Sequence, residues 1–133
     1  MSQSIATYLM YQDGAAEDAV NYYVSQLEDA RIDKIERWGE GEHGPAGKIK
    51  LCHFTLCGRA FIAIDSPPVH EFGFTPSISL FVDVESEAQI DALFAIFSDG
   101  GKVMMPLDNY GFSKKFAWVE DRFGVSWQFN LPA

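Results

Sequence analysis

The last strand-like segment of the chain alternates polar and aromatic residues. In the stretch SWQFN, Ser126, Gln128 and Asn130 alternate with Trp127 and Phe129. Because successive side chains of a strand point to opposite faces, we expect the polar column and the aromatic column to lie on different faces. The amide of Gln128 offers a carbonyl oxygen to a polar ligand or a cation. The alternative is a hydrogen bond to a neighbouring strand.

Three histidines are spread along the chain with no spacing typical of a zinc site. His43 lies in a glycine-rich segment, His70 follows two prolines, and His53 lies between Cys52 and Phe54. We expect His53 to point away from both of its neighbours, towards a ligand site. The alternative is a hydrogen-bonded core or surface histidine, which is the more common role.

The two cysteines, Cys52 and Cys57, lie in one expected strand at an odd separation. They therefore point to opposite faces, which argues against a disulfide between them and predicts reduced thiols. Apart from His53 and Arg59, neither has a flanking base or cation. A cysteine nucleophile is therefore not indicated.

Flat or soft apolar side chains gather in the segment 104–118, namely Met104, Met105, Tyr110, Phe112, Phe116 and Trp118. Phe116 and Trp118 alternate in one strand, so a planar ligand can stack where they project. Core packing is the alternative explanation. Lys114 and Lys115 suit either an anionic group of the ligand or a solvated edge strand.

The composition is typical of one domain over residues 1–133, because 47% of the residues are hydrophobic and 22% are charged. Ten basic and nineteen acidic residues give a formal charge of −9, which argues against partners such as nucleic acid or an anionic membrane. The N-terminus has no basic region followed by a long apolar run. This predicts a cytoplasmic protein.

Two stretches of the chain share one order of elements. In the first we expect a strand over 7–12, a helix over 15–27 and strands over 31–38, 48–57 and 60–65. In the second we expect a strand over 77–84, a helix over 87–97 and strands over 102–106, 114–120 and 125–130. The apolar positions of the two helices share one spacing, with Val20, Tyr23, Val24 and Leu27 matching Ile90, Leu93, Phe94 and Phe97.

This repeated βαβββ order predicts an α+β fold of two tandem modules, about 1–66 and about 77–133. We expect the modules to form a partly closed, cup-like mixed sheet with the helices outside. The concave side of that cup is the expected ligand site. The segments 39–47 and 65–76 hold much of the glycine and proline and are expected to be loops.

Five strings of the sequence resemble the vicinal oxygen chelate superfamily, which includes glyoxalase I, the bleomycin-resistance proteins and extradiol dioxygenases. Within it they are most similar to the PhnB-like group, also labelled 3-demethylubiquinone-9 3-methyltransferase domain. The strings are YLMYQDGAAEDAVNYY (8–23), FTLCGRAFIAIDS (54–66), SISLFVDV (77–84), DGGKVMMPL (99–107) and WVEDRFGVSWQ (118–128). They span nearly the whole chain, and the last string is the most specific.

The resemblance implies where a divalent metal would lie. In metal-dependent members, His, Gln or Glu side chains near the start of the first strand and on the last strand of each half hold the ion. These positions fall on Tyr8, on Ser77, on Gln128 and near Ala63 to Asp65. Only Gln128, and Asp65 if it turns inward, suit a divalent ion, which is too few ligands for tight binding.

The resemblance therefore implies a homodimeric protein that binds a small organic molecule and has no tightly held metal or other cofactor. The ligand-binding residues implied are Tyr8, His53, Ser77, Phe116, Trp118 and Gln128. The alternatives are a metal-dependent lyase, isomerase or oxygenase, and a drug-sequestering resistance protein; no catalytic residue is assigned. Methyl transfer is not expected, because the sequence has no glycine-rich strand-to-helix turn for S-adenosylmethionine.

Overall fold

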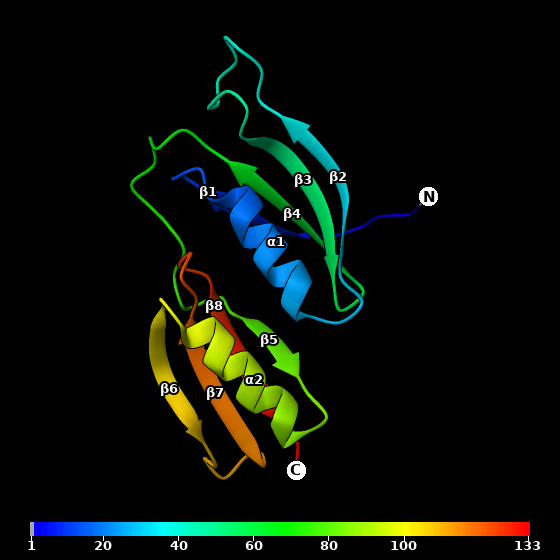
Figure 1. The fold of residues 1–133 in the computed structure, drawn as a ribbon, viewed down its shortest axis with the longest axis vertical. Coiled ribbons are helices and arrows are strands. Elements are labelled where there is room, and N and C mark those ends of the chain that lie inside the picture. The colour runs from blue at the N-terminus through cyan, green and yellow to red at the C-terminus, as the bar shows by residue number, and fades with distance from the viewer. Residues whose placement is uncertain (1) are drawn as a thin grey trace. The chain divides into compact units, whose positions relative to one another are not determined.

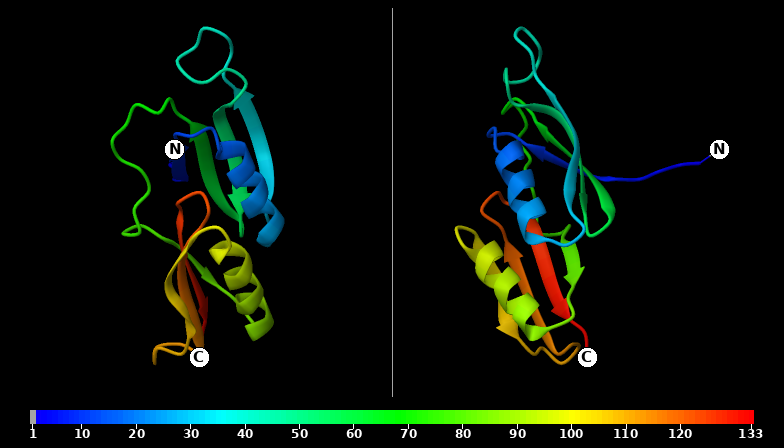
Figure 2. Two further views of the ribbon diagram at one scale, coloured as in Figure 1. Left: turned by 60° about the vertical axis from the view of Figure 1, so that its left-hand side comes forward. Right: turned by 45° about the vertical axis from the view of Figure 1, so that its right-hand side comes forward.

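The computed structural model describes residues 2–133, which form two compact units that meet in the sequence between Gly73 and Phe74. Each unit contains one four-stranded sheet and one helix, in the order strand, helix and three strands (Figures 1 and 2). The predicted α+β class and the two βαβββ modules are confirmed. The boundary between the units falls inside the loop predicted over 65–76.

The first unit consists of β1 (Thr7–Tyr11), α1 (Ala16–Gln26), β2 (Arg31–Arg37), β3 (Ile49–Leu56) and β4 (Arg59–Asp65). Its sheet has the order β1-β4-β3-β2, in which β1 is parallel to β4 and the other pairs are antiparallel. Cys57 and Gly58 connect β3 to β4 with φ angles of 50° and 77°. Positive φ at both central residues is typical of the type I′ turn, whose twist matches that of the flanking strands.

The second unit consists of β5 (Leu80–Asp83), α2 (Glu87–Ser98), β6 (Lys102–Asp108), β7 (Lys115–Glu120) and β8 (Ser126–Leu131). Its sheet has the order β5-β8-β7-β6, and β5 is parallel to β8. The first, fourth, third and second strands thus follow one another in both sheets. This shared topology is the structural form of the internal repeat seen in the sequence.

Each helix packs against one face of its own sheet. In the first unit the hydroxyl oxygens of Tyr11 and Tyr23 lie 3.2 Å apart in the core beneath α1. In the second unit the ring of Phe97 lies 4.8 Å from Trp127 and 5.2 Å from Phe129. The predicted separation of aromatic and polar columns on the last strand is therefore confirmed. No helix within residues 2–133 is long and apolar enough to cross a membrane.

The structure differs from two predictions about the repeat, namely where β5 begins and where the packed face of α1 begins. The strand predicted from Ser77 begins at Leu80, because Ile78 N–H donates to the carbonyl of Thr75 and the chain turns there. In α1 the buried positions are Ala16, Ala19, Val20 and Tyr23, so Val20 and Tyr23 are confirmed and the packed face begins one turn earlier than predicted. Leu27 caps the helix in an extended conformation, so it has already left the packed face.

A buried carboxylate organises the β7–β8 turn. Asp121 is 3% exposed, and one of its oxygens accepts from the backbone N–H groups of Phe123 and Val125. Its other oxygen accepts from Nε1 of Trp127 at 2.8 Å. Gly124 completes the turn with a φ of 93°, the left-handed region expected of a glycine here. The turn therefore positions the start of β8.

Replacing Asp121 by alanine would leave the Trp127 indole and two backbone N–H groups without an acceptor. We expect Asp121→Ala to lower the free energy of unfolding by about 3 kcal/mol, measured by urea denaturation followed by tryptophan fluorescence. The control is Asp99→Ala, because Asp99 is exposed and, within residues 2–133, its side chain pairs with Arg122 alone, at 3.3 Å. A loss for Asp121→Ala no larger than that for Asp99→Ala would contradict the assignment.

Candidate ligand-binding site

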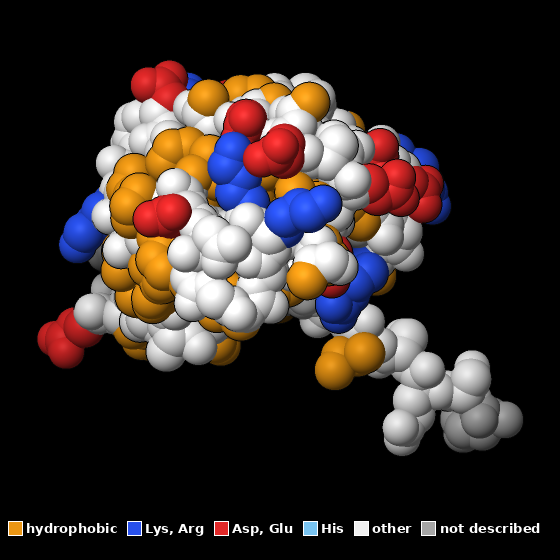
Figure 3. Space-filling view, turned by 90° about the horizontal axis from the view of Figure 1, so that it is seen from below, with side chains coloured by type: hydrophobic (Ala, Val, Ile, Leu, Met, Phe, Trp, Pro, Cys, Tyr) orange, Lys and Arg blue, Asp and Glu red, His pale blue; other side chains and the backbone are white. Residues whose placement is uncertain are grey.

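The face of each sheet opposite its helix carries exposed side chains, and we call it the open face. Tyr8 on β1 is 53% exposed and Phe81 on β5 is 55% exposed. Figure 3 shows hydrophobic side chains at the surface of the molecule, with acidic and basic side chains among them. Exposed aromatic side chains on a sheet face are a feature of ligand and partner surfaces.

A chain of hydrogen bonds crosses the open face of the second sheet. Nε1 of Trp118 donates to Oγ of Ser126 at 2.8 Å, and the hydroxyl groups of Ser126 and Ser79 lie 2.6 Å apart. Nε2 of Gln128 donates to Oγ of Ser79 at 3.2 Å. The carbonyl oxygen of Gln128 accepts no hydrogen bond from residues 2–133. This network fixes the amide and leaves its acceptor available to a ligand.

An aromatic cluster lies beside this network. The ring of Phe116 is 5.0 Å from Phe112, 6.0 Å from Tyr110 and 6.4 Å from Phe81. Phe112 is 63% exposed, whereas Phe116 is buried beneath its neighbours. The predicted gathering of Tyr110, Phe112 and Phe116 is confirmed. Phe81 was missed, although period-two alternation from Gln128 and its parallel partner strand could have found it.

The two lysines at the start of β7 do not form a free cationic patch. Nζ of Lys115 lies 2.7 Å from Asp91 and 3.6 Å from Glu87, both on α2. The hydrogen bond to Asp91 is the main cause of a raised pKa of Lys115. Its charge is thus directed to the helix and away from an anionic ligand. Lys114 is exposed beside it.

The open face of the first sheet carries a row of side chains with different chemistry. In register across the sheet lie Tyr8 on β1, Ile62 on β4, His53 on β3 and Lys34 on β2. Neither the Tyr8 hydroxyl nor the His53 imidazole has a hydrogen-bond partner in the described part of the chain. A phenol and an imidazole therefore flank an isoleucine on this face, as the prediction for His53 requires.

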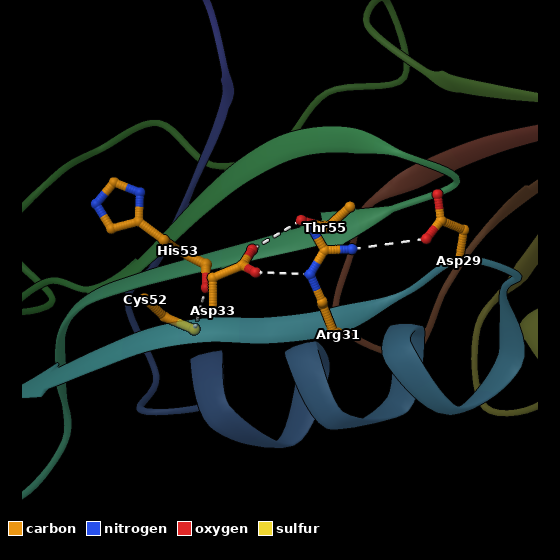
Figure 4. A network of polar contacts seen from close by, with 6 residues as sticks. All are labelled: Asp29, Arg31, Asp33, Cys52, His53 and Thr55. Carbon is orange, nitrogen blue, oxygen red and sulfur yellow. Dashed lines mark hydrogen bonds and ion pairs between the residues drawn. The ribbon is translucent and has the colours of Figure 1, made fainter.

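Next to this row, Asp33 joins two residues of neighbouring strands (Figure 4). Its carboxylate accepts from Oγ1 of Thr55 at 2.7 Å and from Nε of Arg31 at 2.9 Å. The hydrogen bond from Thr55, followed by the charge of Arg31, lowers the pKa of Asp33. The carboxylate remains ionised and its proton-accepting capacity is low, so Asp33 suits an electrostatic role better than that of a general base.

Asp65 does not turn towards the open face, so the condition on which it was a candidate metal ligand is not met. It is fully buried, and its two oxygens accept from the backbone N–H groups of Ala16 and Ile49, each at 2.9 Å. The carboxylate ties the start of α1 and the start of β3 to the end of β4. Period-two alternation explains the direction, because Phe61 and Ala63 also face the helix.

The residues at the expected metal positions do not fit a divalent ion. Ser77 lies before β5, where its hydroxyl pairs with Thr75 at 2.7 Å, and the β5 residue opposite Gln128 is Phe81. In the second unit Phe81 adds no carboxylate or imidazole to the amide of Gln128. In the first unit the imidazole of His53 is joined in its row by the phenol of Tyr8 and by apolar Ile62, which do not complete a ligand set. In residues 2–133 no group of three or more His, Cys, Asp or Glu side chains is arranged to hold a metal.

The strand-to-helix turns do not fit S-adenosylmethionine either. The turn between β1 and α1 contains the single glycine Gly14, and the N-terminus of α1 is occupied by Asp65. At α2 the side chain of Ser86 accepts from Gln89 N–H. Both helix N-termini thus bind side chains of the protein in place of a ligand carboxylate.

Cys52 lies on β3, whereas Cys57, predicted in the same strand, lies in the turn that follows it. Cys52 is buried and Cys57 is exposed, and Figure 4 shows Cys52 and His53 projecting to opposite sides of β3. Burial, followed by the charges of Glu17 and Asp33, raises the pKa of Cys52 from 9.0 to about 11. Burial also raises the pKa of Cys57. The two thiols are not bonded to each other, and neither is set up as a nucleophile.

Comparison with known proteins places this arrangement in a family. The family model described as 3-demethylubiquinone-9 3-methyltransferase matches residues 3–130. The chain is 44% identical to the solved PhnB protein of Bacillus cereus, with a TM-score of 0.92 and coverage of 97% of this chain and 99% of that one. A Pseudomonas aeruginosa protein is 28% identical, with a TM-score of 0.83 and coverage of 98% of both chains.

A more distant structure shows how widely the fold extends. A glyoxylase/bleomycin resistance protein/dioxygenase domain from Frankia is 16% identical, with a TM-score of 0.68, and covers 100% of this chain and 99% of that one. At this identity the likeness concerns the fold alone. No curated protein matches the chain significantly. The resemblance drawn from the five sequence strings is confirmed at the level of family and fold.

The raised pKa of Cys52 predicts a difference in reactivity between the two thiols. Iodoacetamide attacks the thiolate, so raising the pH from 8 to 10 should speed alkylation of exposed Cys57. Cys52, which is 1% exposed and has a pKa of about 11, should react far more slowly at both pH values. Peptide mass spectrometry after timed quenching measures both sites. In urea both should react. Alkylation of Cys52 at the rate of Cys57 in the folded protein would contradict this assignment.

Proposed function

Since the chain belongs to the 3-demethylubiquinone-9 3-methyltransferase family of PhnB-like proteins, we propose that it binds a small planar organic molecule on the open faces of its sheets, without a tightly held metal. The ligand-binding residues proposed are Tyr8, His53, Ser77, Phe116, Trp118 and Gln128. The superfamily resemblance supports a homodimer, and two reduced cysteines are compatible with a cytoplasmic protein.

The observation that carries the proposal is the pairing of a fixed amide with an aromatic surface. Gln128 lies beside Phe81 in the register of β5 and β8, and the rings of Phe81 and Phe116 are 6.4 Å apart. An aromatic ligand gains apolar contact area and ring stacking from this surface. The free carbonyl oxygen of Gln128 then selects a ligand with an N–H or O–H donor at its edge.

The first sheet supports the same class of ligand. Tyr8 and His53 present a phenol and an imidazole on either side of Ile62, and both polar groups are without partners in residues 2–133. Such a surface suits an apolar ring with polar substituents better than a highly charged ligand. Ser77 adds an exposed hydroxyl in the segment before β5.

The role of Gln128 can be tested with planar probes. We expect a thermal-shift screen of 1-naphthol, 2-naphthoic acid and quercetin to identify a binder, and Gln128→Ala to weaken its Kd about ten-fold through loss of one hydrogen bond. Gln26→Ala is the matched control, because Gln26 lies at the exposed end of α1 and donates only to Ser25. Equal affinity for the wild type and Gln128→Ala would refute the role of the amide.

Metal analysis tests the proposal that the protein holds no metal tightly. We expect protein purified without chelator, then incubated with zinc, nickel, manganese or iron and desalted, to hold far less than one ion per chain. The physical reason is that each sheet, taken by itself, offers too few ligands. Gln128 faces apolar Phe81 in the second unit, and His53 is joined by the phenol of Tyr8 and by apolar Ile62 in the first. Near-stoichiometric metal that is lost in Gln128→Ala would instead support a metal-dependent lyase, isomerase or oxygenase.

A further inference from the structure

A hollow of about 510 Å³ lies in the first unit at the ends of two parallel strands. Three short segments form it, namely 12–14 after β1, 43–45 between β2 and β3, and 66–68 after β4. None of the residues proposed above as ligand contacts lines it. Its size is within the range of small-molecule sites, and loops that follow the carboxyl ends of parallel strands commonly form such sites.

One wall of the hollow is fixed by Trp38. The indole packs directly on Gly44, so closely that a Cβ at this position would overlap the ring. Nε1 of Trp38 donates to the carbonyl oxygen of Asp65 at 2.8 Å. The loop that carries His43 and Pro45 is thereby joined to the segment that begins at Ser66. This wall exists before any ligand binds, which lowers the entropic cost of binding.

A second contact fixes the opposite side. The side chain of Gln12 accepts from the backbone N–H of His70 at 3.0 Å and donates to the carbonyl of Phe72 at 2.7 Å. These bonds hold the segment after Pro67 and Pro68 against the β1–α1 turn. Gly14 allows that turn a φ of 79°. The hollow is thus preformed by two independent contacts.

The lining combines proline rings with a small set of polar groups. Pro45, Pro67 and Pro68 provide rigid apolar surface of the kind that packs against aromatic rings. One oxygen of Asp13 accepts from Ala15 N–H at 3.2 Å, and its other oxygen accepts no hydrogen bond from residues 2–133. The imidazole of His43 is likewise without a hydrogen bond in the described chain. These groups suit a ring that carries one hydrogen-bonding cation.

The charges around the hollow limit the ligand further. Nζ of Lys48 lies near Gly14, 3.6 Å from the position a Cβ would take there. A second positive charge on the ligand would be repelled by this ammonium group. We propose that the hollow is a second ligand site, separate from the open faces, that binds a small aromatic amine with a single positive charge through Asp13 and the three prolines.

Benzylamine is the probe, and benzyl alcohol and putrescine are its neutral and doubly charged comparisons. In amide NMR titrations we expect benzylamine to shift the signals of Gly14, Gly44 and Ser66 and the indole N–H of Trp38, with the indole N–H of Trp118 unchanged. Benzyl alcohol and putrescine should bind more weakly. This readout distinguishes the hollow from the open face of the second sheet, so either proposal can fail without the other.

Two charge-matched variants complete the test. Asp13→Asn should weaken benzylamine binding about ten-fold, because it removes a charge-assisted hydrogen bond, and should leave benzyl alcohol binding unchanged. Asp18→Asn removes the same charge from an exposed position of α1 outside the lining and should bind benzylamine as the wild type does. The proposal is overturned by unchanged benzylamine affinity in Asp13→Asn, by an equal loss in Asp18→Asn, or by shifts confined to Trp118.

Discussion

Each sheet has two faces but only one helix, and most of the structure follows from this constraint. Strand side chains alternate, so every residue that packs under a helix has neighbours that point the other way. On β8 the aromatic residues Trp127 and Phe129 contact Phe97 of α2, and Gln128 is therefore directed to the open face. On β1 the burial of Tyr11 beneath α1 leaves Tyr8 exposed. The candidate site and the core thus lie on opposite faces of the same strands. A change that shifted a strand by one residue would turn its core side chains to the open face and its open-face side chains to the core.

Two buried aspartates connect segments of the chain that the helices do not cover. Asp65 ends β4 and binds two backbone N–H groups, and Asp121 begins the turn before β8 and binds two backbone N–H groups and an indole. Both lie in a protein with a formal charge of −9. Most of its other carboxylates are on the surface, where ion pairs contribute little to stability. A carboxylate in this chain is therefore a poor indicator of metal binding unless its backbone partners are known.

The sequence predicted the order of elements well because the pattern of the repeat reports burial, and burial determines which face packs. It located every strand and helix and the direction of Gln128. It was wrong by three residues at the start of β5, because the turn at Thr75 to Ile78 is formed by hydrogen bonds that leave no periodic signal. It left Asp65 open as a weak metal-ligand candidate because residue type shows donor chemistry and not which hydrogen bonds the side chain already makes. The preformed hollow near Gly44 was missed for a related reason, since contacts between distant loops have no local pattern.

The family description names a methyltransferase, whereas the strand-to-helix turns do not fit S-adenosylmethionine. In this chain Asp65 and the helix-facing aromatic residues make their contacts inside the fold, with backbone N–H groups and with α2. Open-face residues carry no such burden, since Tyr8 and Phe81 are each about half exposed and their replacement leaves the core intact. Residues on the open faces of such a fold can therefore vary at small cost in stability. The exposed faces and the loop hollow are therefore the best indicators of function, because their side chains are not needed for core packing.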